Sequence, residues 1–422
     1  LLFKYVDGPQ PLKYSTERLA ELFQSINTHF EINWCTVIVD STLDRLQITG
    51  FDTSDVVANK RIQELFTKLH LDIEADKTHY AALSTSQGFI IVWKDGEELQ
   101  FFYNDPRLCV VIYDPANPTK KLFAAKWFNH VDGRQEITLY YPEKLEHWIS
   151  PKAQTGTAID KASSFLLETT DTNPFGVIPV FELRTAGELF KILTDQDAIN
   201  KTVADLMATG EFSTAPQRYV ISNADTGTLK NSPNQIWWIP AGDGQGQQSS
   251  AGQFPTALPT GFWETIDKFS NAIAIITRTP KHYFMMTGAN ISGEALLAME
   301  SPLVKKIKKR QREFSAQWQD IIAFLLKLEN ITVDPSIIKT IWERVESIQP
   351  LTESQARQNA VNTGIPLVTL LKREGWTDTE IADMQKDKAA QQKAERTVAQ
   401  ALLNDLRIKQ QQENPESEVN NA

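Results

Sequence analysis

The sequence has little of what marks disulfide-bonded, membrane-spanning or nucleic-acid-coating proteins. Only two cysteines, Cys35 and Cys109, occur in 422 residues, which predicts a fold without disulfides in a reducing compartment. No apolar run approaches the roughly 20 residues that a membrane-spanning helix needs. Its 43 Lys and Arg against 53 Asp and Glu give a net charge of −10, so we do not expect the surface as a whole to clamp nucleic acid. The composition predicts a soluble cytoplasmic protein without a membrane partner.

Recognisable catalytic motifs are scarce as well. The six histidines are scattered without the spacing of zinc ligands. The glycine-rich run 242–250 lacks the preceding strand and following helix that phosphate-binding loops need, and no Walker A pattern occurs. We therefore expect no metal, no cofactor and no enzymatic activity.

One enzymatic alternative rests on two short matches. Asp52-Thr53-Ser54 and Asp225-Thr226-Gly227 resemble the paired loops of aspartic proteases, whose two carboxylates share a proton. In those enzymes each loop follows a hydrophobic strand, whereas Asp225 follows Ser-Asn-Ala and precedes a polar stretch typical of a hairpin turn. An aspartic-protease-like hydrolase is a remote alternative.

The first part of the chain mixes helices and antiparallel strands. Apolar residues recur at helical spacing over 14–30, and the run 33–40 is compatible with a helix or a buried strand. Turn signals such as Lys94-Asp95-Gly96 separate four short apolar runs that predict strands. These runs are 88–93, 109–113, 121–128 and 136–141. The fold class predicted for this region is α+β.

The middle of the chain predicts two long helices with a small β module between them. The helices are expected over 186–210 and around 261–279, and the strands over 216–221 and 235–240. The helical apolar faces consist of Leu189, Leu193, Ile199, Val203 and Leu206, and of Phe262, Ile266, Phe269, Ile273 and Ile276.

A loop and a third long helix follow. Pro280 ends the preceding helix, Gly288 and Gly293 loosen the connection, and Asn290 or Ser292 can cap the next helix. That helix is expected to run for about 30 residues. Its apolar stripe consists of Leu303, Ile307, Phe314, Trp318, Ile321 and Leu325. A loop between two long helices suits a segment that projects into open space.

The C-terminal part is expected to be all helical. Thr352 with Gln355, and Thr377 with Glu380, match the capping box, and Gly364 and Gly375 stand where helix C-caps belong. From residue 378 the chain is rich in Ala, Gln, Lys and Glu, and such a polar helix is stable only if it packs on neighbours or on other subunits.

Several short pieces, taken in order, resemble portal proteins of tailed double-stranded DNA bacteriophages, and the resemblance covers nearly the whole chain. The pieces are Asn33-Trp34-Cys35 with Val39-Asp40, Arg45-Leu46 and Gly50-Phe51; Thr172-Asn-Pro-Phe-Gly176-Val-Ile-Pro179; Asp197-Ala-Ile-Asn200-Lys with Pro216-Gln217-Arg218; Arg278-Thr-Pro280 with Ser292-Gly-Glu-Ala295; and Ile341-Trp342-Glu with Thr352-Glu and Gly364-Ile-Pro366.

The resemblance implies a portal architecture. It assigns residues 1–185 to an α+β wing, 186–211 to a stem helix, 212–259 to a β-containing clip and 260–280 to a second stem helix. Residues 281–292 become a tunnel loop, 293–349 a long helix returning to the wing, and 350–422 a helical crown.

The resemblance also implies a structural role. Copies of the chain would form a homo-oligomeric ring, a dodecamer, at the portal vertex of the virion capsid, after synthesis in the host bacterial cytoplasm. Double-stranded DNA would pass through this channel during packaging and ejection. Terminase, a head–tail adaptor and the major capsid protein would be partners. A non-portal oligomeric scaffold or adaptor remains the main alternative.

Two groups of residues are candidates for function within that architecture. The tunnel-loop candidates are Met285, Met286, Thr287, Gly288, Ala289 and Asn290, which offer soft, uncharged contacts to moving DNA. The two methionines are equally compatible with a helix-end core. The basic candidates are Lys305, Lys306, Lys308, Lys309, Arg310 and Arg312, which could face DNA or an acidic neighbouring subunit. Their alternative is the solvated face of an amphipathic helix.

Overall fold

The computed structural model describes residues 2–13, 31–151, 164–214, 218–221, 250–253, 259–284, 292–346, 350–373, 376 and 378–413. The chain divides into two units, Leu1–Glu346 and Ser347–Ala422. The predicted helix 14–30 lies outside the described residues.

In the described part of residues 2–85, the larger unit contains four helices: α1 (Leu2–Asp7), α3 (Trp34–Leu43), α4 (Val56–Lys68) and α5 (Leu71–Thr85). The ambiguous run 33–40 is helical because Asn33 caps α3, its side chain accepting a hydrogen bond from the Thr36 N–H at 3.1 Å. Helices α4 and α5 have no counterpart among the helices predicted from the sequence. Asp55 was the available signal, since it caps α4 by accepting bonds from Val57 and Ala58.

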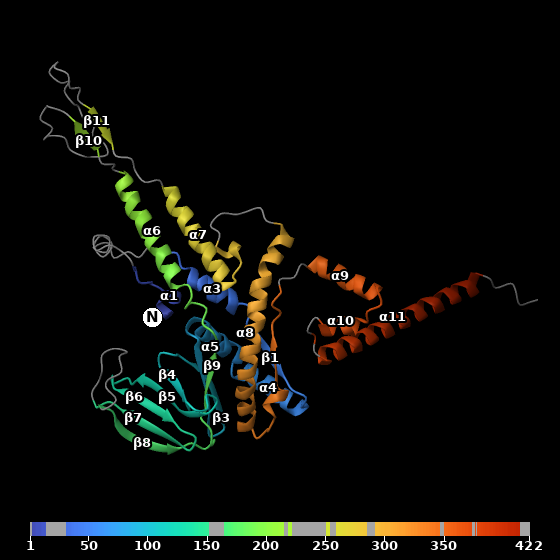
Figure 1. The fold of residues 1–422 in the computed structure, drawn as a ribbon. Coiled ribbons are helices and arrows are strands. Elements are labelled where there is room, and N and C mark those ends of the chain that lie inside the picture. The colour runs from blue at the N-terminus through green and yellow to red at the C-terminus, as the bar shows by residue number, and fades with distance from the viewer. Residues whose placement is uncertain are drawn as a thin grey trace, which may run out of the picture. The chain divides into compact units, whose positions relative to one another are not determined.

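Two antiparallel sheets follow. The first has strand order β3 (Glu98–Asn104), β2 (Gln87–Asp95), β9 (Val180–Arg184). The second has order β4 (Cys109–Tyr113), β5 (Lys121–Asn129), β6 (Gln135–Tyr140), β7 (Lys144–Ile149), β8 (Leu166–Thr172). All four predicted strands are confirmed as β2, β4, β5 and β6, and the fold is mixed α+β as expected (Figure 1).

Strand β2 is apolar on both faces because both are covered. Phe89 and Ile91 belong to a cluster that includes Cys109 of β4 and Ala124 of β5. Alternate residues such as Ile90 belong to the main core shared with the helices. Successive strand residues point to opposite faces, so β2 joins the five-stranded sheet to the helical layer.

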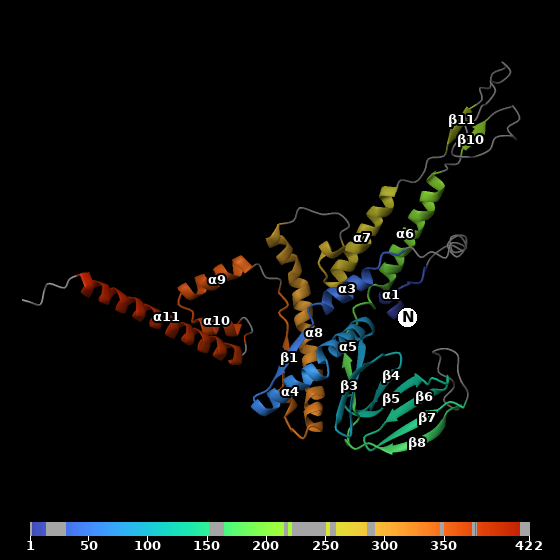
Figure 2. The ribbon, with the colours of Figure 1, turned by 180° about the vertical axis from the view of Figure 1, so that it is seen from behind.

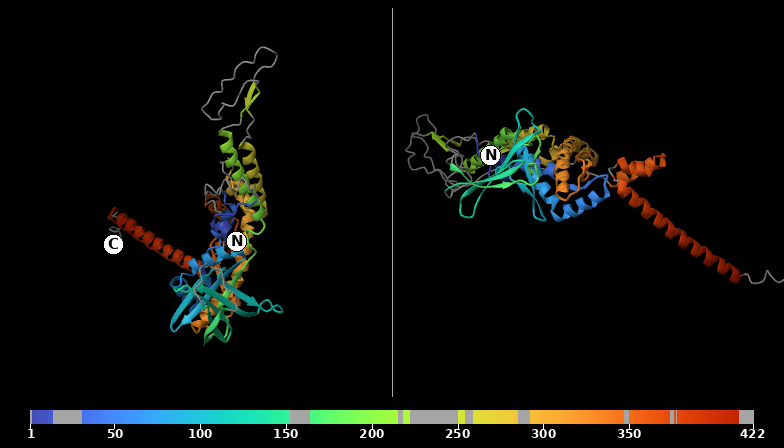
Figure 3. Two further views of the ribbon diagram at one scale, coloured as in Figure 1. Left: turned by 90° about the vertical axis from the view of Figure 1, so that its left-hand side faces the viewer. Right: turned by 90° about the horizontal axis from the view of Figure 1, so that it is seen from below.

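Helices α6 (Leu193–Thr214) and α7 (Pro259–Thr277) lie side by side in three views (Figures 1, 2 and 3). The expected start of the first helix at residue 186 is wrong, because residues 186–192 are not helical, bends and turns occupy 188–192, and α6 begins at Leu193. Gly187 donates its N–H to Ser86 Oγ at 3.0 Å, and a Cβ at Gly187 would come within 2.7 Å of that oxygen. Glu188 N–H also bonds to the Leu83 carbonyl, so this segment is held against the end of α5.

Helix α8 (Gly293–Leu328) contains 36 residues, and Ser292 caps it by accepting a bond from Ala295 N–H. Its predicted apolar stripe is confirmed. The six stripe residues, Leu303, Ile307, Phe314, Trp318, Ile321 and Leu325, are each at most 1% exposed. A 3-10 turn, η3 (Pro335–Ile337), and strand β12 (Lys339–Trp342) follow, and β12 pairs with β1 (Ile48–Asp52).

The β module between α6 and α7 contains an antiparallel pair. Strand β10 (Arg218–Ile221) confirms part of the predicted strand 216–221 and pairs with β11 (Ser250–Gln253). The expected strand 235–240 and the glycine-rich run up to residue 249 lie outside the described residues.

The smaller unit is helical, with α9 (Pro350–Asn362), α10 (Leu367–Arg373) and α11 (Asp378–Glu413). Gly364 has φ +93° just after α9, which confirms the predicted C-cap, because a left-handed backbone favours glycine. Thr352 lies inside α9 rather than at its cap, so that capping box is wrong. Thr377 and Gly375 lie outside the described residues, whereas α11 begins at Asp378.

Candidate functional site

The segment that enters the expected tunnel loop is firmly attached to the larger unit. It forms a 3-10 turn, η2 (Lys281–Phe284), in which Phe284 is 4% exposed and meets the Trp34 ring edge-on at 5.3 Å. Tyr283 Oη donates to Glu300 Oε1 and accepts from Arg45 Nη2, both at 3.0 Å. Glu300 lies on α8 and also pairs with Arg45 at 2.5 Å. Aromatic burial and a charge-assisted network therefore tie η2 to α3, to the loop after α3 and to α8.

The loop candidates themselves lie outside the described residues. They are Met285, Met286, Thr287, Gly288, Ala289 and Asn290. The structure does place the two flanks, since Phe284 precedes the segment in the core and Ser292 caps the helix that follows. The choice between a channel-facing loop and a helix-end core for the two methionines stays a prediction.

A buried polar network anchors α6 at its N-terminal end. Tyr5 Oη donates to Asp197 Oδ1 at 2.6 Å, and Lys13 Nζ bonds to Asp197 Oδ2 at 3.0 Å. Asn200 donates its amide to Gln10 Oε1 at 2.6 Å. Asp197 and Asn200 are each 2% exposed, so the network fixes the helix axis to the N-terminal segment. The short Asp197–Asn200 motif therefore has a structural role that the sequence did not reveal.

Away from this buried network, α6 and α7 expose large apolar side chains to solvent. Met207 on α6 is 42% exposed, while Trp263, Ile275 and Ile276 on α7 are 45%, 79% and 44% exposed. The predicted apolar stripe of α7 is only partly internal, because Ile266 and Ile273 are buried and Ile276 is not. Exposed apolar side chains of this size are candidates for contact with another protein surface.

The basic run on α8 separates into two sets. Lys305, Lys308, Lys309 and Arg312 are exposed. Lys306 and Arg310 are 8% and 7% exposed, and both pair with Glu188, at 3.3 Å and 2.8 Å. For these two residues a solvated face is wrong, because the loop between β9 and α6 covers them with a carboxylate. Burial lowers the pKa of Lys306, although Glu188 opposes this effect.

Two of the scattered histidines meet in the five-stranded sheet. Glu136 on β6 lies between His130 Nε2 at 2.6 Å and His147 Nδ1 at 2.8 Å. Burial alone would raise the pKa of Glu136, but hydrogen bonds from the two imidazoles lower it below its ordinary value. The pairing arises from strand register, which one-dimensional spacing cannot show. Among the described residues no group of His, Cys, Asp and Glu has the arrangement of a metal site.

Catalytic groups do not converge in the described parts of the chain. Asp52 accepts a hydrogen bond from the Asn59 amide at 2.8 Å in the turn before α4, and Asp225 lies outside the described residues. Both cysteines are buried and unbridged, and burial raises the pKa of each thiol to about 12. Such thiols are poor nucleophiles. None of the described helices is long and apolar enough to cross a membrane.

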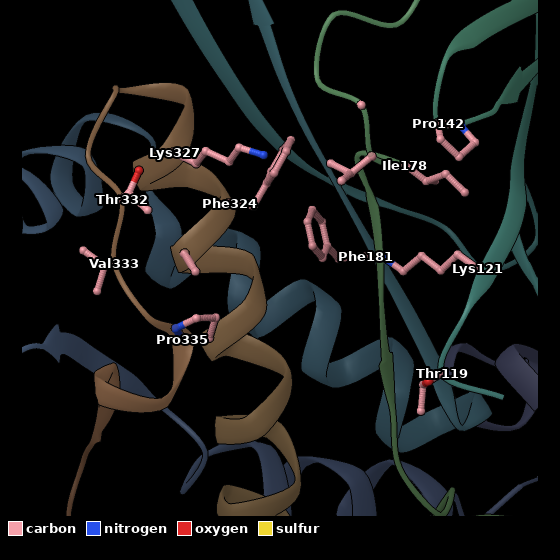
Figure 4. Close-up of a pocket in the computed structure, with 13 residues that line it drawn as sticks. Thr119, Lys121, Pro142, Ile178, Phe181, Phe324, Lys327, Thr332, Val333 and Pro335 are labelled. Atoms are coloured by element: carbon pink, nitrogen blue, oxygen red, sulfur yellow. The ribbon is translucent and has the colours of Figure 1, made fainter. Parts of the chain in front are cut away.

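A cavity of about 510 Å³ lies between the five-stranded sheet, β9 and the C-terminal part of α8 (Figure 4). Lys121 and Lys327 extend from its two sides toward the rings of Phe181 and Phe324 (Figure 4). Lys121 Nζ donates to the Val180 carbonyl at 2.7 Å, and burial lowers its pKa to about 8. The lining contains no carboxylate, imidazole or thiol, so it offers no acid–base pair.

Comparison with known proteins identifies the family to which this chain belongs. The family model described as "Phage portal protein, SPP1 Gp6-like" matches residues 32–394. A portal protein of Mycobacterium phage D29 is 21% identical over 403 residues, covering 86% of this chain and 79% of the relative. A portal protein of Mycobacterium phage L5 is 21% identical over 345 residues, covering 74% of this chain and 68% of the relative.

One solved structure is loosely similar in fold to this chain. It is a chain described as "Neck of empty GTA particle computed with C6 symmetry", with a TM-score of 0.41 and 10% identity, covering 86% of this chain and 98% of that one. At this TM-score the similarity gives no basis for assigning a family or a function. The family match instead extends from α3 into α11, across nearly all the elements described above. It confirms the resemblance seen in the sequence, and the chain belongs to the SPP1 Gp6-like family of phage portal proteins.

Proposed function

We propose that this chain is the repeating subunit of a ring at one vertex of the capsid, and that the ring is the channel for DNA packaging and ejection. The observation that carries the proposal is the portal family match over residues 32–394. A family of structural virion proteins gives no reason to expect catalysis, and the described residues assemble no catalytic group. We infer a homo-oligomeric ring, a dodecamer, that also serves as the docking platform for terminase and the head–tail adaptor.

Within this proposal the parts take the roles that the sequence resemblance implied. Helices α6 and α7 are the stem, the module containing β10 and β11 is the clip, and the tunnel loop is residues 281–292, of which the first four form the anchored turn η2. Residues 1–185 with α8 form the wing, and residues 350–422 form the crown. The anchored flanks of the loop support its assignment, because a projecting segment needs rigid ends if it is to act on DNA.

The charge balance supports a conduit rather than a clamp. Each phosphate held by a fixed cation adds affinity and resists sliding. The chain carries a net charge of −10, and two of the six cations on the α8 basic run are occupied by Glu188. A channel lined by such subunits would let duplex DNA move with little retention.

Native mass spectrometry and negative-stain images of the purified protein test the ring. We expect a closed particle with an axial hole wide enough for duplex DNA. Oligomers without a hole would instead support a scaffold or adaptor. A second experiment deletes Thr287–Asn290 and compares ring assembly with DNA packaging. The deletion should leave rings intact and impair packaging or retention, and normal packaging would argue against the loop's role.

A further inference from the structure

A small cavity rich in positive charge lies where the loop before α6, the end of α7 and the middle of α8 meet. Its volume is about 240 Å³. Its charged lining residues are Lys191, Arg278, Lys306, Lys309 and Arg310, together with one acid, Glu188. A second acid, Glu313, approaches Lys309 at 3.7 Å and Arg310 at 3.0 Å. The cavity therefore has five positive side chains and only two carboxylates in or beside it, an excess of positive charge. We call this cavity the Arg278 pocket.

In the deep part of the pocket the positive side chains already have partners within the chain. Arg310 Nη2 bonds to Glu188 Oε1 at 2.8 Å and to the Ala186 carbonyl at 2.7 Å, and Lys306 Nζ approaches Glu188 Oε2 at 3.3 Å. At the mouth, Lys191 and Arg278 are exposed, and neither has an acidic partner among the described residues. The uncompensated charge therefore lies at the entrance, where an arriving anion would meet it.

The backbone at Arg278 is a second, independent observation. Arg278 has φ +56° at the C-terminal end of α7, where Thr279 N–H bonds to the Ala274 carbonyl at 3.1 Å and Arg278 N–H to Ile275 at 3.3 Å. This hydrogen-bond pattern is a Schellman motif, and glycine is the usual residue at its left-handed position. Arginine there carries a conformational cost that glycine would avoid. This outlier motivates the hypothesis that the Arg278 side chain has a function.

Apolar side chains flank the pocket entrance. Ile275 and Ile276, which lie three and two positions before Arg278, are 79% and 44% exposed, and Ile276 lines the pocket. Apolar residues beside a charged arginine are typical of protein–protein interfaces, in which arginine is enriched.

We propose that the Arg278 pocket binds a carboxylate, from an aspartate or glutamate side chain, of a second copy of this chain. The proposal rests on the proposed function, which places copies beside one another. It accounts for the charge excess, because the carboxylate supplies the missing negative charge and can accept two parallel bonds from the Arg278 guanidinium. The chain has 53 acidic residues against 43 basic ones, so acidic partners are plentiful on its copies.

The test replaces Arg278 and follows self-association. Arg278→Asn removes the guanidinium but keeps a residue that tolerates the left-handed backbone. Lys60→Gln is the control, because it removes one exposed positive charge on α4, outside the pocket. Sedimentation velocity across a salt series should show that the protein concentration needed for assembly is at least tenfold higher for Arg278→Asn than for the wild type, whereas Lys60→Gln should behave like the wild type. Arg278→Lys should fall between them, because it keeps the charge and loses the bidentate geometry.

Monomer unfolding separates this effect from misfolding. Arg278→Asn should unfold at a temperature no lower than that of the wild type, since the backbone strain is relieved. Wild-type assembly by Arg278→Asn at all salt concentrations would overturn the pocket proposal. If that variant assembled normally and lost affinity for duplex DNA, the occupant would be a phosphate and the proposal would also fail. A wild type that forms oligomers without an axial hole, still weakened by Arg278→Asn, would instead overturn only the proposed function.

Discussion

Helices α8 and α11 each contain 36 residues, yet they bury their apolar side chains very differently. The six stripe residues of α8 are at most 1% exposed, because strands and helices of the larger unit surround them. On α11, by contrast, four apolar residues are 58–60% exposed: Val398, Leu402, Leu403 and Leu406. Long helices gain most of their stability from tertiary packing. The comparison teaches that α8 is stabilised within one chain, whereas α11 presents a surface suited to packing in an assembly.

The largest expected effect comes from Trp318 on α8. It is fully buried, and its indole N–H donates to His79 Nε2 at 3.0 Å. Trp318→Ala should lower the free energy of unfolding by about 3–5 kcal/mol, because it leaves a cavity and an unpaired imidazole nitrogen. Urea unfolding of the monomer measures this change. Leu402→Ala on α11 is the control and should cost less than about 0.5 kcal/mol. Equal losses of unfolding free energy for the two variants would contradict the proposed difference in packing between α8 and α11.

The next largest effect on stability is expected from the buried ion cluster of Glu188, Lys306 and Arg310. Glu188→Ala would leave Lys306 and Arg310 buried without their shared carboxylate, which should cost about 3 kcal/mol of unfolding free energy. Glu346→Ala is the matched comparison, because it removes the partner of Lys308 in an exposed pair. Exposed pairs contribute about 0–1 kcal/mol. A small loss for Glu188→Ala would mean that water replaces the carboxylate and that the cluster is not sealed.

The pH dependence of stability should also come from the packing of α8. Burial lowers the pKa of His79 to about 3, and its ring stacks on Phe314 at 4.5 Å. The unfolded chain binds a proton at this site below pH of about 6.5, and the folded chain does not, so stability is lost as pH falls from about 6.5 toward 3. At pH 5 the loss is about 2 kcal/mol.

His79→Gln should flatten this slope in unfolding experiments between pH 7 and 5, because glutamine keeps an acceptor for Trp318 but does not titrate. A wild-type slope that persists in His79→Gln would assign the titration to another group.

The smallest effect on the monomer is expected on α11. Replacing Leu402 and Leu406 by serine should change the unfolding free energy of the monomer by less than about 0.5 kcal/mol, since both side chains are already in water. The same double substitution should weaken assembly, measured by native mass spectrometry across a dilution series. Unchanged assembly would show that α11 does not pack between copies.

Local patterns made much of α8 predictable. Its apolar stripe has helical period, Ser292 supplies a visible cap, and Pro280 ends the segment before it. The strands β2, β4, β5 and β6 were predictable for a similar reason, because β-branched and aromatic runs alternate with turn residues. Helix α5 was missed because its buried residues include three alanines together with Thr78, His79 and Ser84, which give a weak apolar periodicity.

The remaining features depend on contacts between distant residues. Lys306 and Arg310 looked like a solvated face because Glu188, their partner, lies more than 100 positions earlier in the chain. The start of α6 was misplaced because contacts of Gly187 and Glu188 with α5, rather than local propensity, hold residues 186–192 out of the helix. His130 and His147 meet across Glu136 only through strand register. The backbone strain at Arg278 likewise has no signature in the sequence.

An image of the assembled protein in projection down its axis, joined to its native mass, tests the central claim most directly. The portal account predicts a closed ring of identical subunits with an open centre that admits a DNA duplex. A protein that stays monomeric at every concentration, or that assembles into particles without a central opening, would contradict it.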